Sequence, residues 1–258
     1  MPRLGWALGL VPVVVVLGVW EALGGAGVVD VRFFPTPSSI AAAAWETLVS
    51  GEFWTHLSAT LVRVAYGYVP GALAGVVVGL LLGTVPVLGR LFRPSLTAAY
   101  TVPKLGIFPL LLLVFGLGDP AKVALVALAV FLLVVIATVD ASRNVSRAYL
   151  DVGAVFSASF AHRFGEIVLP ASAPVIFTSL RLAMGQSILV VIATEMVNGT
   201  DGIGYLIWHS WSVFQPASMF VGIVASALLG AVLIAFIGGL ERWCLPWASR
   251  RRGGRVVL

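Results

Sequence analysis

Two charged side chains stand where this chain is otherwise apolar. Lys104 lies between Pro103 and Pro109, and Glu195 directly follows an apolar stretch that ends at Thr194. A charge inside a membrane helix costs on the order of 3 kcal/mol or more on insertion scales, so such residues generally face protein or water. Lys104 either lines a polar path, where it would favour an anion, or extends toward the cytoplasmic interface. Glu195 either gates such a path, pairs with a cation on another helix, or is solvated at the outer surface.

The remaining reactive groups predict no catalytic or metal site. One cysteine, Cys244, excludes an internal disulfide and a cysteine cluster. The three histidines, His56, His162 and His209, are expected in different loops and form no ligand set. The chain has no Gly-x-x-x-x-Gly-Lys-Ser/Thr loop for a nucleotide and no Ser/His/Asp or Cys/His arrangement. We therefore expect no catalytic residue, metal or cofactor in this chain.

Composition predicts an integral membrane protein. Hydrophobic residues make up 60% of the chain and charged residues 10%, and the mean hydropathy is +1.05. A membrane helix needs about 20 mostly apolar residues. We expect an all-α protein with six transmembrane helices, the first of which is retained and not removed as a signal peptide. The six segments are Leu4–Leu23, Ala65–Val85, Thr97–Leu117, Pro120–Val139, Pro174–Met196 and Met219–Leu240.

The basic residues predict the orientation of these segments. Eleven of the 16 Lys and Arg residues fall on one side and three in the opposite loops, which places the larger group in the cytoplasm. Both termini are then cytoplasmic. We attribute the net charge of +5 to lipid-facing tails, with no nucleic-acid binding. The cytoplasmic set is Arg3, Arg90, Arg93, Arg143, Arg147, Arg163, Arg242, Arg250, Arg251, Arg252 and Arg255, and the outer-loop set is Arg32, Arg63 and Lys122.

Four glycines recur at every fourth position of the second segment: Gly71, Gly75, Gly79 and Gly83. This spacing places them along one helix face and leaves a groove without side chains. Membrane helices approach closely at such faces because they associate by van der Waals contact. We favour a packing face over the alternative that glycine is simply common in this chain.

An apolar face also marks the cytoplasmic loop 140–170. Tyr149, Val152, Phe156 and Phe160 are spaced three, four and four residues apart, which predicts a short helix. The flanks are too charged for this helix to span a membrane. Its apolar face either folds back on the membrane helices or enters a groove in a partner protein.

The same loop carries a spaced motif: Asp151-Val152-Gly153, then Ser157, then Ile167, then Leu169-Pro170. Its spacing resembles the cytoplasmic signature of the membrane permease subunit of bacterial ABC importers. That signature is Glu-Ala-Ala, three residues, Gly, nine residues, Ile, one residue, Leu-Pro. The register is intact here, while Asp replaces Glu, Val and Gly replace the two Ala, and Ser replaces Gly.

Other segments are similar to the nitrate, sulfonate and taurine branch of these permeases, which includes importers of pyrimidine precursors. One is Pro35-Thr36-Pro37-Ser38-Ser39, where a turn and a Ser N-cap signal precede a short helix, Ile40–Leu48. This helix either lies along the membrane surface or merely connects two spans. The others are Pro103–Leu110 with Phe115–Gly118, and Gly202–Ile207.

The resemblance implies a type I importer permease that forms one domain over residues 1–258, with a core at 57–240, a coupling loop at 140–170 and a basic tail at 241–258. It also implies a second copy of the chain, two ABC ATPase subunits that bind ATP and Mg, an extracytoplasmic substrate-binding protein, and a location in the bacterial inner membrane. An ion-gradient-driven secondary transporter or channel is the alternative, but the internal repeats typical of that class are not evident. The expected coupling residues are Tyr149, Asp151, Val152, Gly153, Phe156, Ser157, Ile167, Leu169 and Pro170.

Overall fold

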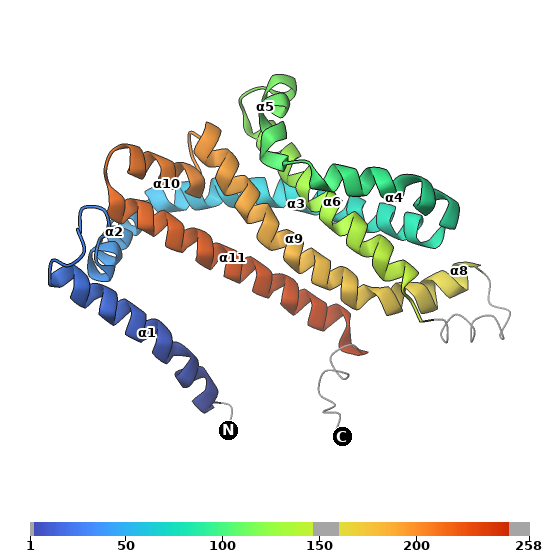
Figure 1. Ribbon diagram of the computed structural model, residues 1–258, viewed down its shortest axis with the longest axis horizontal. Coiled ribbons are helices and arrows are strands. Elements are labelled where there is room, and N and C mark those ends of the chain that lie inside the picture. Colours follow the sequence, from blue (N-terminus) through green and yellow to red (C-terminus); the bar gives the residue numbers. More distant parts are fainter. Residues whose placement is uncertain (1–2, 147–159, 248–258) are drawn as a thin grey trace. The chain divides into compact units, whose positions relative to one another are not determined.

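The computed structural model describes residues 3–146 and 160–247, and every regular element in these ranges is a helix (Figure 1). The chain divides into two compact units. Unit 1 comprises Met1–Thr60 and Glu195–Ala227, and unit 2 comprises Leu61–Thr194 and Leu228–Leu258. The prediction of an all-helical protein is confirmed within the described ranges.

Four described helical stretches are long and apolar enough to cross a membrane. They are α3 (Glu52–Thr84), α6 (Asp119–Arg143), the stretch Phe164–Asn198 and α11 (Pro216–Cys244). A bent pair of helices adds a fifth span if it crosses as one unit. In the first predicted segment, α1 runs over Arg3–Gly25, and its described apolar part, Val11–Gly25, is shorter. The count of six spans therefore stays a prediction.

The core of unit 2 lies around α6. This helix is apolar on nearly all sides, and Leu125, Val126, Val130 and Val134 are fully buried. A helix that is hydrophobic all round needs partners on every face or lipid around it. Side chains of α3, α9 (Leu169–Asn198) and α11 complete this cluster.

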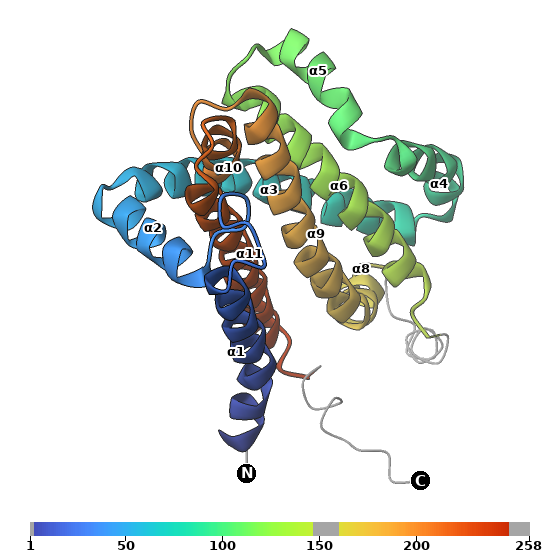
Figure 2. The ribbon, with the colours of Figure 1, turned by 60° about the vertical axis from the view of Figure 1, so that its left-hand side comes forward.

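The third predicted segment is not one continuous helix. It forms α4 (Pro86–Thr101) and α5 (Lys104–Phe115), with a bend of 93° between them. Pro103 lies at the break, where its ring restricts the preceding residue and removes a backbone donor. Both helices pack on α6 (Figure 2). The predicted segment Thr97–Leu117 is therefore broken, and its crossing of the membrane as one bent span stays a prediction.

Unit 1 contains α1, α2 (Pro37–Val49) and α10 (Ile203–Ser212), and α1 contacts α2. Helix α2 begins earlier than the predicted Ile40, because Thr36, and not a serine, is its N-cap. The Thr36 hydroxyl accepts a hydrogen bond from the Ser39 amide, and Pro37 occupies the first turn. The carboxylate of Glu21 accepts hydrogen bonds from the amide and the hydroxyl of Ser38, which ties α2 to α1.

Candidate functional site

The glycines of α3 lie directly against α6. A Cβ added at Gly71 would lie 2.5 Å from the Ala127 carbonyl oxygen, and one at Gly79 would lie 2.5 Å from the Thr138 Cβ. A Cβ added at Gly75 would likewise lie too close to the Val134 side chain, and one at Gly83 too close to the Ser142 side chain. Real Cβ atoms do not approach other atoms so closely, so side chains on this face would force the two backbones apart.

The close approach extends one turn beyond the predicted set. A Cβ at Gly67 would lie 2.6 Å from Val126. Gly67 precedes Gly71 by four residues, so the same spacing could have found it. The α3 face therefore carries five glycines: Gly67, Gly71, Gly75, Gly79 and Gly83.

Two of the three basic residues assigned to outer loops are helical and buried. The side chains of Arg63 in α3 and Lys122 in α6 are each only 3% exposed. Arg63 Nε donates to Asp119 Oδ1 at 2.8 Å, and Lys122 Nζ donates to the same oxygen at 3.3 Å. The prediction that Arg63 and Lys122 lie in outer loops was therefore wrong. The carboxylate that pairs with Arg63 belongs to Asp119, which lies far along the chain and cannot be recognised as a partner from local composition.

Lys104 is engaged with the helix that precedes it. Its ammonium donates to the Tyr100 carbonyl oxygen at 2.7 Å and lies 4.1 Å from the Tyr100 ring centroid. The last carbonyls of a helix lack intrahelical donors, so Lys104 satisfies one of those at the end of α4. These contacts give Lys104 a local structural role, and its part in a translocation path stays a prediction.

Glu195 is buried in unit 1, with 1% exposure, so the alternative of a solvated surface carboxylate was wrong. Its carboxylate accepts the Thr60 hydroxyl at 3.0 Å and the Gly204 amide at 2.9 Å. Thr60 in turn accepts the Ile203 amide at 2.9 Å. Ile203 and Gly204 begin α10, where amides lack intrahelical acceptors and a negative charge is favoured. Glu195 thus holds the first turn of α10.

His56 lies beside the same turn and is 6% exposed. Its Nδ1 accepts the Gly202 amide at 3.1 Å, which requires an unprotonated Nδ1. The Tyr205 ring neighbours both imidazoles, with its centroid 5.7 Å from that of His56 and 5.3 Å from that of His209. Both histidines are in helices, contrary to the prediction of loops. No metal-binding group of three His, Cys, Asp or Glu side chains occurs among the described residues.

Gly202 is required by this arrangement. Its φ of +107° is unfavourable for residues with a side chain. A Cβ at this position would also overlap the Glu195 carboxylate. The start of the predicted Gly202–Ile207 segment, which consists of Gly202 and the first turn of α10, therefore places backbone donors against Glu195, His56 and Thr60.

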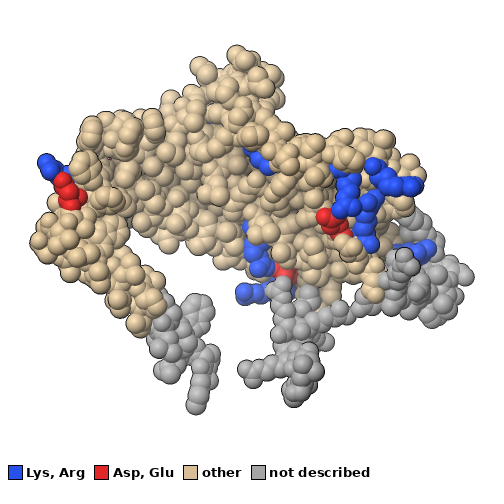
Figure 3. All heavy atoms as spheres, viewed as in Figure 1, with Lys and Arg blue, Asp and Glu red and all other residues tan. Residues whose placement is uncertain are grey.

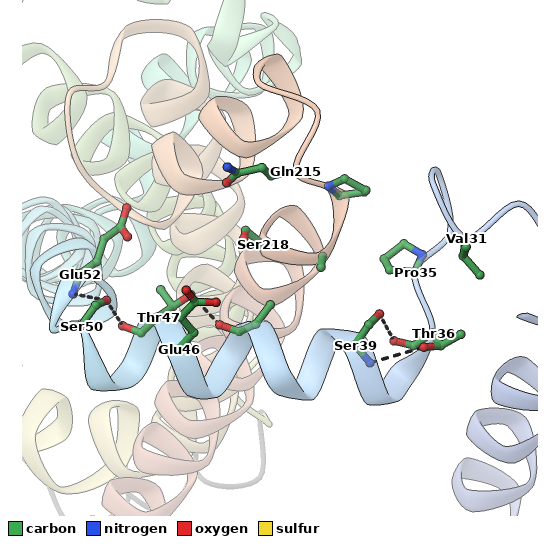
Figure 4. A pocket seen from close by; sticks show the side chains of 13 residues that line it. Val31, Pro35, Thr36, Ser39, Glu46, Thr47, Ser50, Glu52, Gln215 and Ser218 are labelled. Carbon is green, nitrogen blue, oxygen red and sulfur yellow. Dashed lines mark hydrogen bonds between the residues drawn. The ribbon is translucent and has the colours of Figure 1, made fainter. Parts of the chain in front are cut away.

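Unit 1 also contains an open pocket of about 740 Å³ between α2 and the start of α11, lined by both polar and apolar groups (Figure 4). Ser39 and Thr36 lie at one end of α2, Ser50 and Glu52 lie near the other, and Gln215 and Ser218 face them. None of the residues that line it is basic, while Glu46 and Glu52 are acidic. The pocket therefore offers hydroxyl and carboxylate groups but no cation for an anionic solute.

The described end of the predicted coupling motif lies at a change of helix type. After α8 (Phe160–Arg163), residues Phe164–Val168 form the π-helical turn η1, and α9 begins at Leu169. The Leu169 amide donates to the Phe164 carbonyl, and Pro170 has no amide to donate. Ile167 and Pro170 are half-buried, and Leu169 is 38% exposed. Tyr149, Asp151, Val152, Gly153, Phe156 and Ser157 lie outside the described residues.

Comparison with known proteins gives consistent matches along the chain. Residues 71–245 match the family model described as binding-protein-dependent transport system inner membrane component. SsuC of Bacillus subtilis (strain 168), named for aliphatic sulfonates transport, is 33% identical, over 97% of this chain and 91% of its own length. NrtB of Leptolyngbya laminosa, named a nitrate import permease protein, is 29% identical, over 90% of this chain and 85% of its own.

The fold has a counterpart among solved structures. The MetNI methionine ABC transporter, in an inward-facing conformation, contains a chain that matches with a TM-score of 0.54. The alignment covers 82% of this chain and 97% of that chain at 16% identity. The likeness shows that the two chains share a fold.

Proposed function

We propose that this chain, which belongs to the family of binding-protein-dependent transport system inner membrane components, is the membrane permease of an ATP-driven importer for a small anionic or polar solute. The observation that carries the proposal is the alignment with SsuC over 97% of the chain. The long apolar helices and the glycine-mediated contact between α3 and α6 supply the membrane scaffold that such a subunit needs. We assign the protein to the bacterial inner membrane, with both termini in the cytoplasm.

The named substrates of SsuC and NrtB support a sulfonate or nitrate as the transported solute, and a pyrimidine precursor fits the same proposal. The acidic pocket beside α2 offers no cation for such an anion. We therefore place solute selection in an extracytoplasmic binding protein, and not in that pocket.

We propose that energy reaches the permease through the segment Asp151–Pro170. Two ATPase subunits would bind ATP and Mg, and each would receive the apolar face of one cytoplasmic helix. Leu169 and Pro170 at the start of α9 support this route, because they join the segment directly to a long apolar helix. This chain supplies the mechanical path and no catalytic group.

We propose two residues, Lys104 and Glu195, for the translocation path. Lys104 would lie beside the path at the junction of α4 and α5, where its ammonium is already held by Tyr100. Glu195 would act as a positioning residue, since it is buried and binds the first turn of α10.

The coupling proposal is tested by the variant Phe156→Asp. A charge placed in a fitted apolar cleft costs a few kcal/mol, enough to weaken docking strongly. The importer, reconstituted in liposomes with its ATPase subunits and binding protein, should then lose substrate-stimulated ATP hydrolysis and uptake together. The membrane chain itself should remain folded in detergent.

The matched control is Phe156→Leu, which keeps an apolar side chain and should retain most uptake. Full ATPase binding and substrate-stimulated uptake by Phe156→Asp would show that this helix is not the coupling element. Thermal shifts of the binding protein with nitrate, sulfonates and pyrimidine precursors would identify the solute separately.

A further inference from the structure

Helices α4 and α5 differ in the way they present side chains, although they are adjacent in sequence. After Lys104, helix α5 is apolar on all sides, whereas α4 carries a separate polar strip. Leu88 and Leu96 of α4 pack toward α6. Arg90 and Arg93 occupy a second strip, three residues apart, and a third strip exposes Val87 and Leu91 by 65% and 66%.

This distribution is typical of a helix that lies in the membrane interface. One strip packs on protein, one apolar strip remains for lipid chains, and one basic strip remains for the headgroup layer. The bend of 93° between α4 and α5 agrees, because it allows α5 to enter the hydrocarbon while α4 stays in the plane of the surface.

Three guanidinium groups gather at this end of unit 2, contributed by Arg90, Arg93 and Arg143. Figure 3 shows blue basic atoms concentrated over α4 and the adjoining end of α6. Arg93 pairs with Asp140 at 3.0 Å, and both side chains are about half exposed. Arg90 makes only a long hydrogen bond, 3.4 Å, to the Pro86 carbonyl among its described contacts.

Arg143 reaches this group because α4 has no side chain at Gly89. A Cβ at Gly89 would overlap the Arg143 guanidinium, which extends from the last turn of α6. The glycine thus leaves room for the third arginine next to the other two. With Asp140 as the paired carboxylate, these four residues carry a net charge of +2, that is, three positive charges against one negative.

We propose that Arg90, Arg93 and Arg143 form a binding surface for the headgroup of an anionic phospholipid, with Val87 and Leu91 against its acyl chains. Guanidinium groups bind phosphate oxygens in a two-pronged geometry, and basic pockets at the cytoplasmic ends of membrane helices suit anionic headgroups. The exposed apolar strip beside the arginines favours a lipid over a soluble acidic partner. A soluble partner that bound only the arginines would leave Val87 and Leu91 in water, whereas the acyl chains of a lipid would cover them.

The test is a titration of the full-length chain in detergent with phosphatidylglycerol or phosphatidylcholine, read by native mass spectrometry. The double variant Arg90→Gln/Arg93→Gln should raise the apparent Kd for phosphatidylglycerol about 25-fold, since each basic residue near an anionic surface contributes about fivefold. Binding of phosphatidylcholine should not change.

Two further variants make the result specific. Arg32→Gln removes a positive charge from an exposed position of unit 1 and should bind phosphatidylglycerol like the original chain. Arg90→Lys/Arg93→Lys keeps the charge and should retain part of the affinity, and it carries the test if the Gln variant does not fold.

Unchanged phosphatidylglycerol affinity in the Gln variant would overturn the proposal. An equal loss of affinity per charge removed in Arg32→Gln would also overturn it, because the effect would then be one of overall charge. If the purified importer carrying the Gln variant lost its ATPase subunits while the lipid affinity of the chain was unchanged, this surface would be assigned to the ATPase instead.

Discussion

At the scale of residues, Glu195 shows how a charge is accommodated in an apolar chain. Its carboxylate is 1% exposed, and burying a charge without partners would be severely unfavourable. The Thr60 hydroxyl and the Gly204 amide provide hydrogen bonds, and the start of α10 provides a favourable dipole. The same interactions fix the turn at Gly202, so Glu195 combines stabilisation of its own charge with placement of the loop.

This arrangement predicts different effects for two substitutions. Glu195→Ala leaves the buried Gly204 amide without its acceptor, which costs about 1–3 kcal/mol per lost group. The thermal unfolding temperature should fall, and amide hydrogen exchange at residues 199–204 should accelerate. Glu195→Gln keeps an oxygen acceptor and should lie between Glu195→Ala and the original chain in both measurements.

The control is Glu46→Ala, which removes an exposed carboxylate from the same unit. It should leave unfolding and exchange nearly unchanged. If Glu195→Ala exchanged no faster at residues 199–204 than Glu46→Ala, the carboxylate would not hold this turn.

At the scale of elements, glycine spacing determines how closely α3 approaches α6. In a membrane, helices gain little from excluding water, so the closeness of backbone contact matters. Five glycines keep the contact face of α3 free of side chains from Gly67 to Gly83. Bulky side chains occupy the opposing α6 face at Val126 and Val134.

We expect even one methyl group on this face to destabilise the protein. In Gly79→Ala the new Cβ would lie 2.5 Å from the Thr138 Cβ and 2.9 Å from the Val135 carbonyl oxygen. Overpacking of this kind costs about 1–3 kcal/mol. Gly239→Ala is the matched control, because no atom lies within 4 Å of its added Cβ. Thermal unfolding in detergent should separate the two variants, and equal unfolding temperatures would show that the α3 face tolerates side chains.

Hydropathy and spacing were sufficient to predict the long helices and four of these five glycines, because both signals are local. They failed at the start of α3, where His56 and Arg63 were expected in loops. Each polar group there is satisfied by a residue far along the chain, Gly202 for His56 and Asp119 for Arg63. Local composition cannot reveal such partners. Local composition also does not give the bend of 93° between α4 and α5, both of which pack on α6.

At the scale of the whole molecule, the chain exposes much apolar surface that lipid or another protein must cover. On α5, Leu113 and Val114 are 82% and 74% exposed. The chain has a single motif of the coupling type, Asp151–Pro170. In the proposed importer, two ATPase subunits each engage one such segment, so a second chain is expected, and a closed two-fold pair is the simplest assembly of identical chains.

We therefore expect two copies of this chain in the purified importer. Native mass spectrometry of the complex, released from mild detergent, should give two permease copies with two ATPase subunits. Co-expression of two differently tagged copies provides an independent measurement, since purification through one tag should recover the other in a folded, monodisperse complex. A complex with one copy beside a different permease would exclude the homodimer. In that case the second chain should carry its own coupling segment, because the requirement for two ATPase contacts would be unchanged.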